Sequence, residues 1–356
     1  MSSFAAEENC EEVIRAFLLR TAELLHRHGT PSYRLEGVMG KVAESLNISS
    51  VFLYTPTALV ISLGSGEDER TFVRRIDSGG IDISKVLAFD AVLEDLEAGN
   101  ISIGEAAERL EAAANAPAPF SLRVTLLAAA AACAGVAVIF GGSMLDAMVA
   151  GLFGCAIAGV TTLSQRSFEQ QGWLEPLLGF AAAICAVVIS QWLPVNDRLI
   201  TVAALILPIP GLTLTIALTE IATGHLSSGS AQLAGAAVTL FTLVLGVAIA
   251  WRVSVDWVQP LQPMVALPQW SLWLAVGLTP LAFAVVFKAP VSQWPAIVLV
   301  VVGGFAVGRF VSETAGTEFG AFAGALMVGC GSNVYARTLN RPAMVPQTPG
   351  LLILVP

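Results

Sequence analysis

ALILPIPGLTLTIALTEIATGH occupies residues 204–225, in the middle of a long apolar region. Its length and composition are typical of a helix that crosses a lipid bilayer, which needs about 20 apolar residues. Pro208, Pro210 and Gly211 interrupt the stretch near its centre. Because the bilayer core offers no hydrogen bonds to free backbone groups, irregular backbone at that depth is tolerated only beside protein or a water-filled cavity. The stretch therefore predicts a broken membrane helix.

The composition indicates that much of the chain lies in a lipid bilayer. Of its 356 residues, 55% are hydrophobic and 13% are charged, and the mean hydropathy is +0.75. Such a balance exceeds what a soluble domain needs for its core. Apolar runs of about the length of a membrane helix recur from Val124 onward, at about 124–140, 143–163, 174–193, 199–220, 230–250, 270–287, 294–311 and 315–336, with a ninth beginning near Ala343.

The net charge of −9 belongs to the first third of the chain. Residues 1–120 hold 10 Lys+Arg and 19 Asp+Glu, whereas residues 121–356 hold 8 of each kind. The pattern of helical and strand signals over residues 1–119 is helix, helix, three strands, helix, helix, which predicts a small α+β domain. We expect this domain to be cytoplasmic, because its acidic beginning lacks the pattern of a secretory signal peptide and the loop charges weakly favour that orientation.

The N-terminal region shows no sign of catalysis. Its acidity argues against nucleic-acid binding, and it contains no nucleophile elbow, phosphate-binding loop or dinucleotide motif. The five cysteines of the chain lack metal-ligand spacing,. We therefore expect no enzyme activity, no metal and no cofactor. Thr30 is expected to cap a helix that starts at Pro31, and His26 and His28 are expected to be solvated residues at a helix end.

The end of the chain repeats the proline-glycine break. MVPQTPGLLILVP (344–356) places Pro349-Gly350 in the ninth apolar run, whereas Pro210-Gly211 falls in the fourth. We expect a five-helix repeat at 120–250, a linker at 251–269 and an incomplete second repeat at 270–356. Five spans are an odd number, so the second copy would be inverted, an arrangement typical of secondary transporters. A plain proline kink in a structural helix is the alternative.

The breaks suggest a substrate site. The second half of the broken helix would present backbone N–H groups at Pro210-Gly211 to a carboxylate, because these groups carry the positive end of the helix dipole. Thr213 and Thr215 follow on its first turn. Three further residues are expected to line the same cavity and to offer oxygen atoms to an ammonium group, namely Pro349, Gly350 and Asn333.

Three ionisable residues at or near span ends are candidates for proton coupling. Glu220 follows the broken helix, and burial beside apolar neighbours would favour its uptake of a proton. His225 could share this proton, although a loop histidine is usually solvated. Asp146 is the third candidate, with a helix cap at the outer face as the alternative.

Several motifs in register resemble the threonine/serine exporter family. They are HRHGTPSYRLEGVMGKVAESLNI (26–48), VFLYTPTALVISL (51–63), RTFVRRID (70–77), GNISIGEAAERL (99–110), FGGSMLDAMVAG (140–151), PIPGLTLT (208–215) and PGLLILVP (349–356). The resemblance covers nearly the whole chain and implies a cytosolic domain followed by two sets of five helices. It also implies export of threonine and serine across the cell (inner) membrane by proton antiport. The family pattern continues beyond Pro356, so the last helix is expected to be missing.

The sequence leaves alternative functions open. A dicarboxylate exporter of the succinate type belongs to the same class, but Lys and Arg are absent from the middle of the expected spans, which favours a zwitterionic substrate. A membrane sensor with a cytosolic signalling domain would need a phosphoacceptor or nucleotide motif, which the sequence lacks. The expected partners are a small-molecule amino acid and membrane lipid, and the sequence is compatible with a homo-oligomer.

Overall fold

The computed structural model describes residues 2–66, 69–76, 79–167, 172–257 and 267–354. These residues form two compact units. Unit 1 comprises Met1–Pro119 together with Thr213–Ala234, and unit 2 comprises Phe120–Leu212 together with Gly235–Pro356. The boundary between the units therefore falls inside two helices, because both α9 (Gly211–Ala222) and α10 (Leu226–Val253) contribute residues to each unit.

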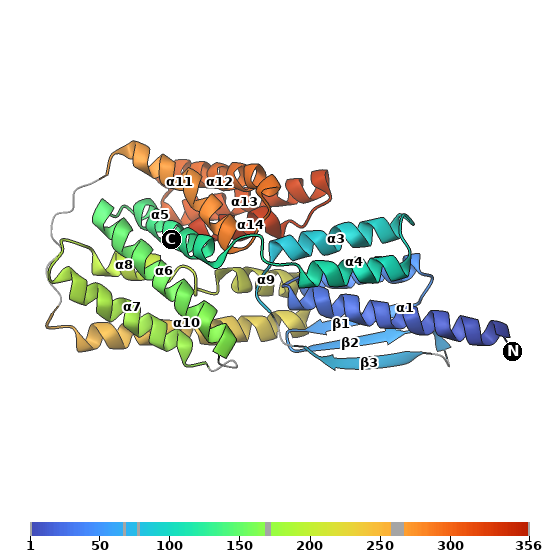
Figure 1. Cartoon of the computed structure of the whole chain (residues 1–356). Helices are drawn as coiled ribbons and strands as arrows, with labels where there is room; N and C mark the ends of the chain where they lie inside the picture. The colour runs from blue at the N-terminus through green and yellow to red at the C-terminus, as the bar shows by residue number, and fades with distance from the viewer. Residues whose placement is uncertain (1, 67–68, 77–78, 168–171, 258–266, 355–356) are drawn as a thin grey trace. The chain divides into compact units, whose positions relative to one another are not determined.

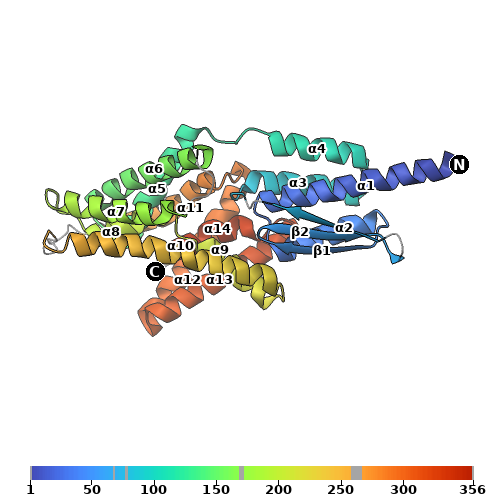
Figure 2. The same ribbon diagram turned by 90° about the horizontal axis from the view of Figure 1, so that it is seen from below.

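Unit 1 has the element order that the sequence predicts for its first part. The elements are α1 (Ser2–Arg27), α2 (Ser32–Ser45), β1 (Ser50–Thr55), β2 (Ala58–Leu63), β3 (Arg70–Arg75), α3 (Ile83–Glu97) and α4 (Ile103–Asn115). The strands form an antiparallel sheet in the order β1-β2-β3, and Thr55 pairs with Ala58 across the tight turn at Pro56. Figures 1 and 2 show the helices of this part gathered on one face of the sheet.

Alternation along the strands explains this layering. Phe52 and Tyr54 of β1 point into the core together with Leu59, Ile61 and Leu63 of β2, whereas the intervening residues are more exposed. Successive side chains of a strand face opposite sides of the sheet, so one face is apolar and needs a cover. Buried residues of the helices, such as Leu18, Leu35 and Phe89, complete this core.

Unit 2 is helical. Its elements are α5 (Leu122–Ile139), α6 (Met144–Ser167), α7 (Leu174–Ser190), α8 (Asp197–Ala204), the shared helices α9 and α10, α11 (Gln269–Val286), the short 3-10 helix η2 (Val291–Gln293), α12 (Trp294–Ala315), α13 (Thr317–Leu339) and α14 (Met344–Leu354). Among the described residues, six helical segments are long and apolar enough to cross a membrane: Leu122–Ile139, Met144–Ser164, Leu226–Val253, Gln269–Val286, Val291–Ala315 and Thr317–Leu339. The inverted repeat, the count of nine spans and the domain limits drawn from the sequence stay predictions, and residues 258–266 of the expected linker lie outside the described residues.

The expected break at Pro349-Gly350 is wrong. Both residues lie inside α14, which continues through them. A proline inside a helix removes one backbone hydrogen bond, and neighbouring protein can compensate for this loss. Pro349 and Gly350 are both buried. A Cβ on Gly350 would come within 2.7 Å of Val328 on α13. The glycine therefore serves close packing of α14 against α13, where the sequence suggested an interruption.

Small residues set the distance between α12 and α13. A Cβ on Gly308 would lie 3.1 Å from the carbonyl oxygen of Gly320, and a Cβ on Gly320 would lie 2.6 Å from the carbonyl oxygen of Gly308 and overlap Ser312 Oγ. Glycine-spaced faces let membrane helices approach closely and pack backbone against backbone.

Gly320→Ala should destabilise unit 2. The added methyl group meets backbone atoms that cannot move aside, and overpacking of this kind costs about 1–3 kcal/mol. The matched control is Gly329→Ala on the same helix, where a Cβ meets no atom within 4 Å. The midpoint of thermal unfolding in detergent should fall for Gly320→Ala and stay or rise for Gly329→Ala. Equal midpoints for the two variants would contradict the close approach.

Candidate functional site

The predicted break near residue 208 is present. Helix α8 ends at Ala204 and α9 begins at Gly211, and between them residues 205–208 form a turn that is followed by a bend at residue 209. Leu205 and Ile206 are buried. Two short backbone hydrogen bonds organise the turn, from Ile209 N to Leu205 O (3.2 Å) and from Gly211 N to Ile209 O (2.9 Å). Prolines at 208 and 210 lack the N–H groups that a continuous helix would use, which explains the interruption.

The first turns of α9 carry the hydroxyl groups that the sequence singled out. Thr213 is exposed and Thr215 is half-buried, and both follow Gly211 directly on α9. The structure therefore places four of the predicted substrate residues, Pro210, Gly211, Thr213 and Thr215, on one helix start. Asn333 is exposed on α13, whereas its neighbour Ser332 is buried and its hydroxyl has no partner among the described residues.

Glu220 is the centre of a buried polar cluster in unit 1. Its side chain is 0% exposed. Oε1 accepts a hydrogen bond from the backbone N–H of Ser32 (2.8 Å), and Oε2 accepts one from Nε2 of Gln232 (2.8 Å). The hydroxyl groups of Ser32 and Ser228 lie 2.7 Å apart, and Gln232 also donates to Ser228 Oγ (3.2 Å). We name Glu220, Ser32, Ser228 and Gln232 the Glu220 cluster.

The Glu220 cluster corrects the expected cap of α2. The helix begins at Ser32, and Pro31 is its N-cap residue without a capping side chain. Thr30, the expected cap, is buried and its hydroxyl has no partner among the described residues. The N-terminal N–H groups of a helix need acceptors, and a carboxylate also complements the helix dipole. Glu220 supplies that acceptor from a residue far along the chain, which local sequence rules cannot foresee.

His225 lies beside this cluster and forms a second link to α2. Its Nε2 is 3.0 Å from Oε2 of Glu36, and its Nδ1 is 3.1 Å from the hydroxyl of Thr223. The pair is partly exposed, with 23% of the His225 side chain and 27% of the Glu36 side chain accessible. The loop between α9 and α10 thus contacts α2 through the pair of His225 and Glu36. This contact adds to the hydrogen bond between Glu220 of α9 and the first residue of α2.

His26 of α1 and His28, which follows the end of α1, differ from the expectation. His26 is buried, donates from Nε2 to the carbonyl oxygen of Pro56 (3.2 Å) and stacks on Tyr54. Burial lowers the pKa of His26,. His28 donates from Nδ1 to the carbonyl oxygen of Leu24 (2.8 Å), and burial lowers its pKa as well. Both rings therefore pack and hydrogen-bond within unit 1, and neither is a solvated helix-end cation.

Asp146 plays a similar capping role in unit 2. Its side chain is 0% exposed. Oδ2 accepts from the backbone N–H and the hydroxyl of Ser143 (2.7 Å each), and Ser143 Oγ accepts from the N–H of Asp146 (3.2 Å). This reciprocal pair is a capping box at the start of α6. Oδ1 accepts from the N–H of Asn196, which is itself the N-cap of α8 (2.7 Å). Asp146 thus joins the starts of two helices.

Three residues of the Glu220 cluster escaped the sequence analysis. Ser228 and Gln232 are four residues apart and share one face of α10, and this spacing next to Glu220 is a weak signal that could have been noticed. Ser32 gives no such signal, because its contacts with Glu220 and Ser228 join residues 188 and 196 positions apart in the chain. Among the described residues no group of His, Cys, Asp and Glu could hold a metal ion.

The described elements define a class of protein: a membrane protein with several spanning helices, a small α+β unit and one helix broken at a proline-glycine step. Residues 16–254 match the family described as "Putative threonine/serine exporter", and residues 273–356 match the family described as "Threonine/Serine exporter, ThrE". The chain therefore belongs to the threonine/serine exporter family.

Curated relatives are distant and longer. The chain is 26% identical over 355 residues to "Pheromone-regulated membrane protein 10" of Eremothecium gossypii, covering 96% of this chain and 47% of that protein. The chain is 22% identical over 354 residues to the protein of the same name in Saccharomyces cerevisiae, covering 96% of this chain and 46% of that protein. A "Probable threonine/serine exporter" of Mycobacterium tuberculosis is 21% identical over 241 residues, covering 66% and 45%. The chain spans about half the length of these relatives, and no solved structure gives a significant match.

Glu220→Ala should loosen the first turn of α2. The substitution leaves the buried N–H of Ser32 and the amide of Gln232 without their acceptor, and an unpaired buried donor costs about 1–3 kcal/mol. Amide hydrogen exchange at the start of α2 should become faster, while exchange in β2 stays slow. Glu313→Ala, which removes an exposed partner of Arg309, is the control and should leave α2 unchanged. Unaltered exchange in Glu220→Ala would show that Glu220 does not cap α2.

Proposed function

We propose that this chain exports small polar amino acids, threonine and serine, across a cell (inner) membrane, with unit 1 facing the cytoplasm. The observation that carries the proposal is the helix broken between Ala204 and Gly211 in a chain with six membrane-capable helices. Membership of the threonine/serine exporter family supports the same assignment, as does the printed name of the mycobacterial relative.

We place the substrate carboxylate at the start of α9. Helix α9 has 12 residues. As in any α-helix, its first turn carries the positive end of the helix dipole. A carboxylate is the ligand that such a terminus stabilises. The hydroxyl groups of Thr213 and Thr215 would add hydrogen bonds without the desolvation cost of a buried lysine or arginine. Pro349 and Gly350 have no part in this proposal, because α14 is continuous through them.

The alternatives make different demands on the chain. A dicarboxylate exporter would need a second positive group for the second carboxylate of its substrate. The cations of the described membrane-capable helices lie toward their ends, as Arg123 in α5, Arg252 in α10 and Arg337 in α13 illustrate. A signalling sensor would need a reactive or nucleotide-binding site in unit 1, and neither the Glu220 cluster nor the pair His26 and His28 forms one.

Efflux measurements separate these functions. Cells that produce the chain are loaded with labelled threonine, serine or succinate, and loss of label is followed with and without an uncoupler of the proton gradient. We expect threonine and serine to leave faster than from cells without the protein, and the uncoupler to abolish that difference. Faster loss of succinate alone would favour the dicarboxylate exporter, and no accelerated efflux of any label would favour a sensor.

Glu220 is our first choice for proton coupling, with His225 as its neighbour. One oxygen of Glu220 binds a side-chain amide, Gln232, that can rotate away, so the group could exchange a proton during transport. Asp146 is the weaker candidate because both its oxygens bind groups at helix starts. Four titratable groups lie near Glu220: His26 of α1, whose pKa burial lowers, Tyr33 of α2, whose pKa burial raises, and the paired Glu36 and His225.

Glu220→Gln should remove the pH dependence of efflux. The amide keeps an oxygen for the N–H of Ser32 but can neither gain nor lose a proton in the working range. Threonine efflux is measured over a series of external pH values in both proteins. We expect a rate that changes with pH in the wild type and a flat, lower rate in the variant, whereas Glu36→Gln should retain the wild-type profile. A wild-type profile in Glu220→Gln would exclude this residue as the coupling group.

A further inference from the structure

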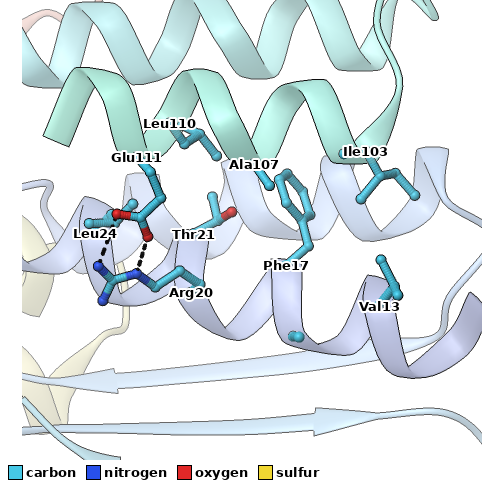
Figure 3. A pocket seen from close by; sticks show the side chains of 11 residues that line it. Val13, Phe17, Arg20, Thr21, Leu24, Ile103, Ala107, Leu110 and Glu111 are labelled. Atoms are coloured by element: carbon cyan, nitrogen blue, oxygen red, sulfur yellow. Dashed lines mark hydrogen bonds and ion pairs between the residues drawn. The ribbon is translucent and has the colours of Figure 1, made fainter. Parts of the chain in front are cut away.

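Unit 1 contains a pocket that the proposed transport path does not use. It lies between α1 and α4 and has a volume of about 310 Å³, at the lower end of the range for small-molecule sites,. Its walls are mostly apolar, and small residues such as Ala16, Gly104 and Ala107 leave the space open. Figure 3 shows the side chains of both helices turned toward this space.

The two ends of the pocket differ in chemistry. At one end, the guanidinium of Arg20 donates from Nε to Oε1 of Glu111 (2.5 Å) and from NH2 to Oε2 (3.2 Å). The other end is formed by Phe17, Val13 and Ile103, as Figure 3 shows. A molecule that fills the pocket would therefore place a polar head beside the ion pair and an apolar tail beside the phenylalanine.

Thr21 lies between these two ends and its hydroxyl is unsatisfied. The residue is 1% exposed, and its Oγ1 has no hydrogen-bond partner among the described residues. A threonine in a helix can bond the carbonyl oxygen four residues back, as Thr161 bonds Ile157 and Thr219 bonds Thr215 here,. Thr21 does not. A buried polar atom without a partner calls for an explanation, and a ligand that meets this hydroxyl supplies one.

The charges at the polar end limit the head group. A free carboxylate would meet Arg20 but also Glu111, and a free amine would meet Glu111 but also Arg20. A zwitterion satisfies both, with its carboxylate on the guanidinium and its ammonium on the carboxylate. The existing pair is half-exposed, with 49% of the Arg20 side chain and 41% of the Glu111 side chain accessible, and Arg20 also donates from Nη1 to Oε2 of Glu23 (3.4 Å). Exposed ion pairs contribute little to stability, so a ligand can open this one.

Other ligand classes fit less well. A nucleotide would need several donors for its phosphates, whereas the lining offers one guanidinium that is already paired,. A metal ion would need several oxygen, nitrogen or sulfur ligands, and the lining has one carboxylate,. The apolar tail region excludes a strongly polar side chain, because it would be buried without hydrogen bonds.

We propose that the pocket between α1 and α4 binds a free amino acid with a large apolar side chain, such as leucine. The carboxylate binds Arg20, the ammonium binds Glu111, Thr21 completes the head-group site, and the side chain packs on Phe17 and Ile103. This site does not depend on the proposed transport function. It gives unit 1 a role as a binding module for an amino acid other than the exported ones.

Calorimetric titration of the full chain in detergent tests whether binding requires both the carboxylate and the ammonium of the ligand. The probes are leucine, 4-methylpentanoate, which lacks the ammonium, and 3-methylbutylamine, which lacks the carboxylate. We expect leucine to bind and each half-ligand to bind at least about tenfold more weakly, because each loses a hydrogen bond between charged groups. No heat of binding with leucine, or equal affinity for leucine and either half-ligand, would overturn the proposal.

Two variants locate the site. Ala107→Leu should fill the pocket and abolish leucine binding while the midpoint of thermal unfolding stays or rises. Thr21→Val should weaken leucine binding about fivefold, the worth of one neutral hydrogen bond, yet raise the midpoint without ligand because it removes an unsatisfied hydroxyl. Arg109→Gln, which breaks an exposed ion pair to Glu105 away from the pocket, is the control and should bind leucine normally. Wild-type leucine affinity in folded Ala107→Leu would place the site elsewhere.

Discussion

The structure depends on one constraint: a backbone N–H or C=O group in apolar surroundings must find a partner. A continuous helix meets this demand by itself, and most of the apolar segments of this chain do so. The exception is the stretch from Leu205 to Pro210, where two prolines remove donors and the chain turns between α8 and α9. We propose that the helix start that follows this break, at Gly211, takes part in substrate binding.

Helix starts recur at the other polar sites of the molecule. Glu220 accepts from the first N–H of α2, and Asp146 accepts from the N-cap residues of both α6 and α8. Each of these buried carboxylates thus accepts a hydrogen bond from the N-terminus of a helix that is distant in sequence. A buried charge is stable only with such partners. The same electrostatics that hold these helices in place make the start of α9 suitable for the carboxylate of a substrate.

Periodic patterns made most of the fold predictable. The alternation in β1 and β2 and the apolar runs of unit 2 are local signals, and the corresponding elements are present. The failures concern tertiary contacts. Pro349 and Gly350 look like Pro210 and Gly211 in sequence, but packing of Gly350 against Val328 keeps α14 continuous. Likewise, nothing local to Ser32 reveals that a residue 188 positions away caps its helix.

The sequence predicted the positions of only some residues of the candidate site. The sequence placed Pro210, Gly211, Thr213 and Thr215 at a helix start because proline and glycine act locally. It missed Gln232 and Ser228 because their importance comes from burial beside Glu220, which no periodicity reveals. The sequence also gave no indication of the pocket at Thr21. Arg20 and Glu111 are 91 residues apart, and each has the appearance of an ordinary surface charge.

We propose that the start of α9 binds the exported amino acid, and threonine efflux from a Gly211→Leu variant tests this proposal. A leucine side chain at this position covers the first N–H groups of α9, so the account predicts that efflux falls to the level of cells without the protein. The variant must reach the membrane in normal amount, and Gly277→Leu in α11, where a Cβ meets no atom within 4 Å, should export normally. Wild-type threonine efflux from Gly211→Leu would contradict the account and show that the break is only a kink.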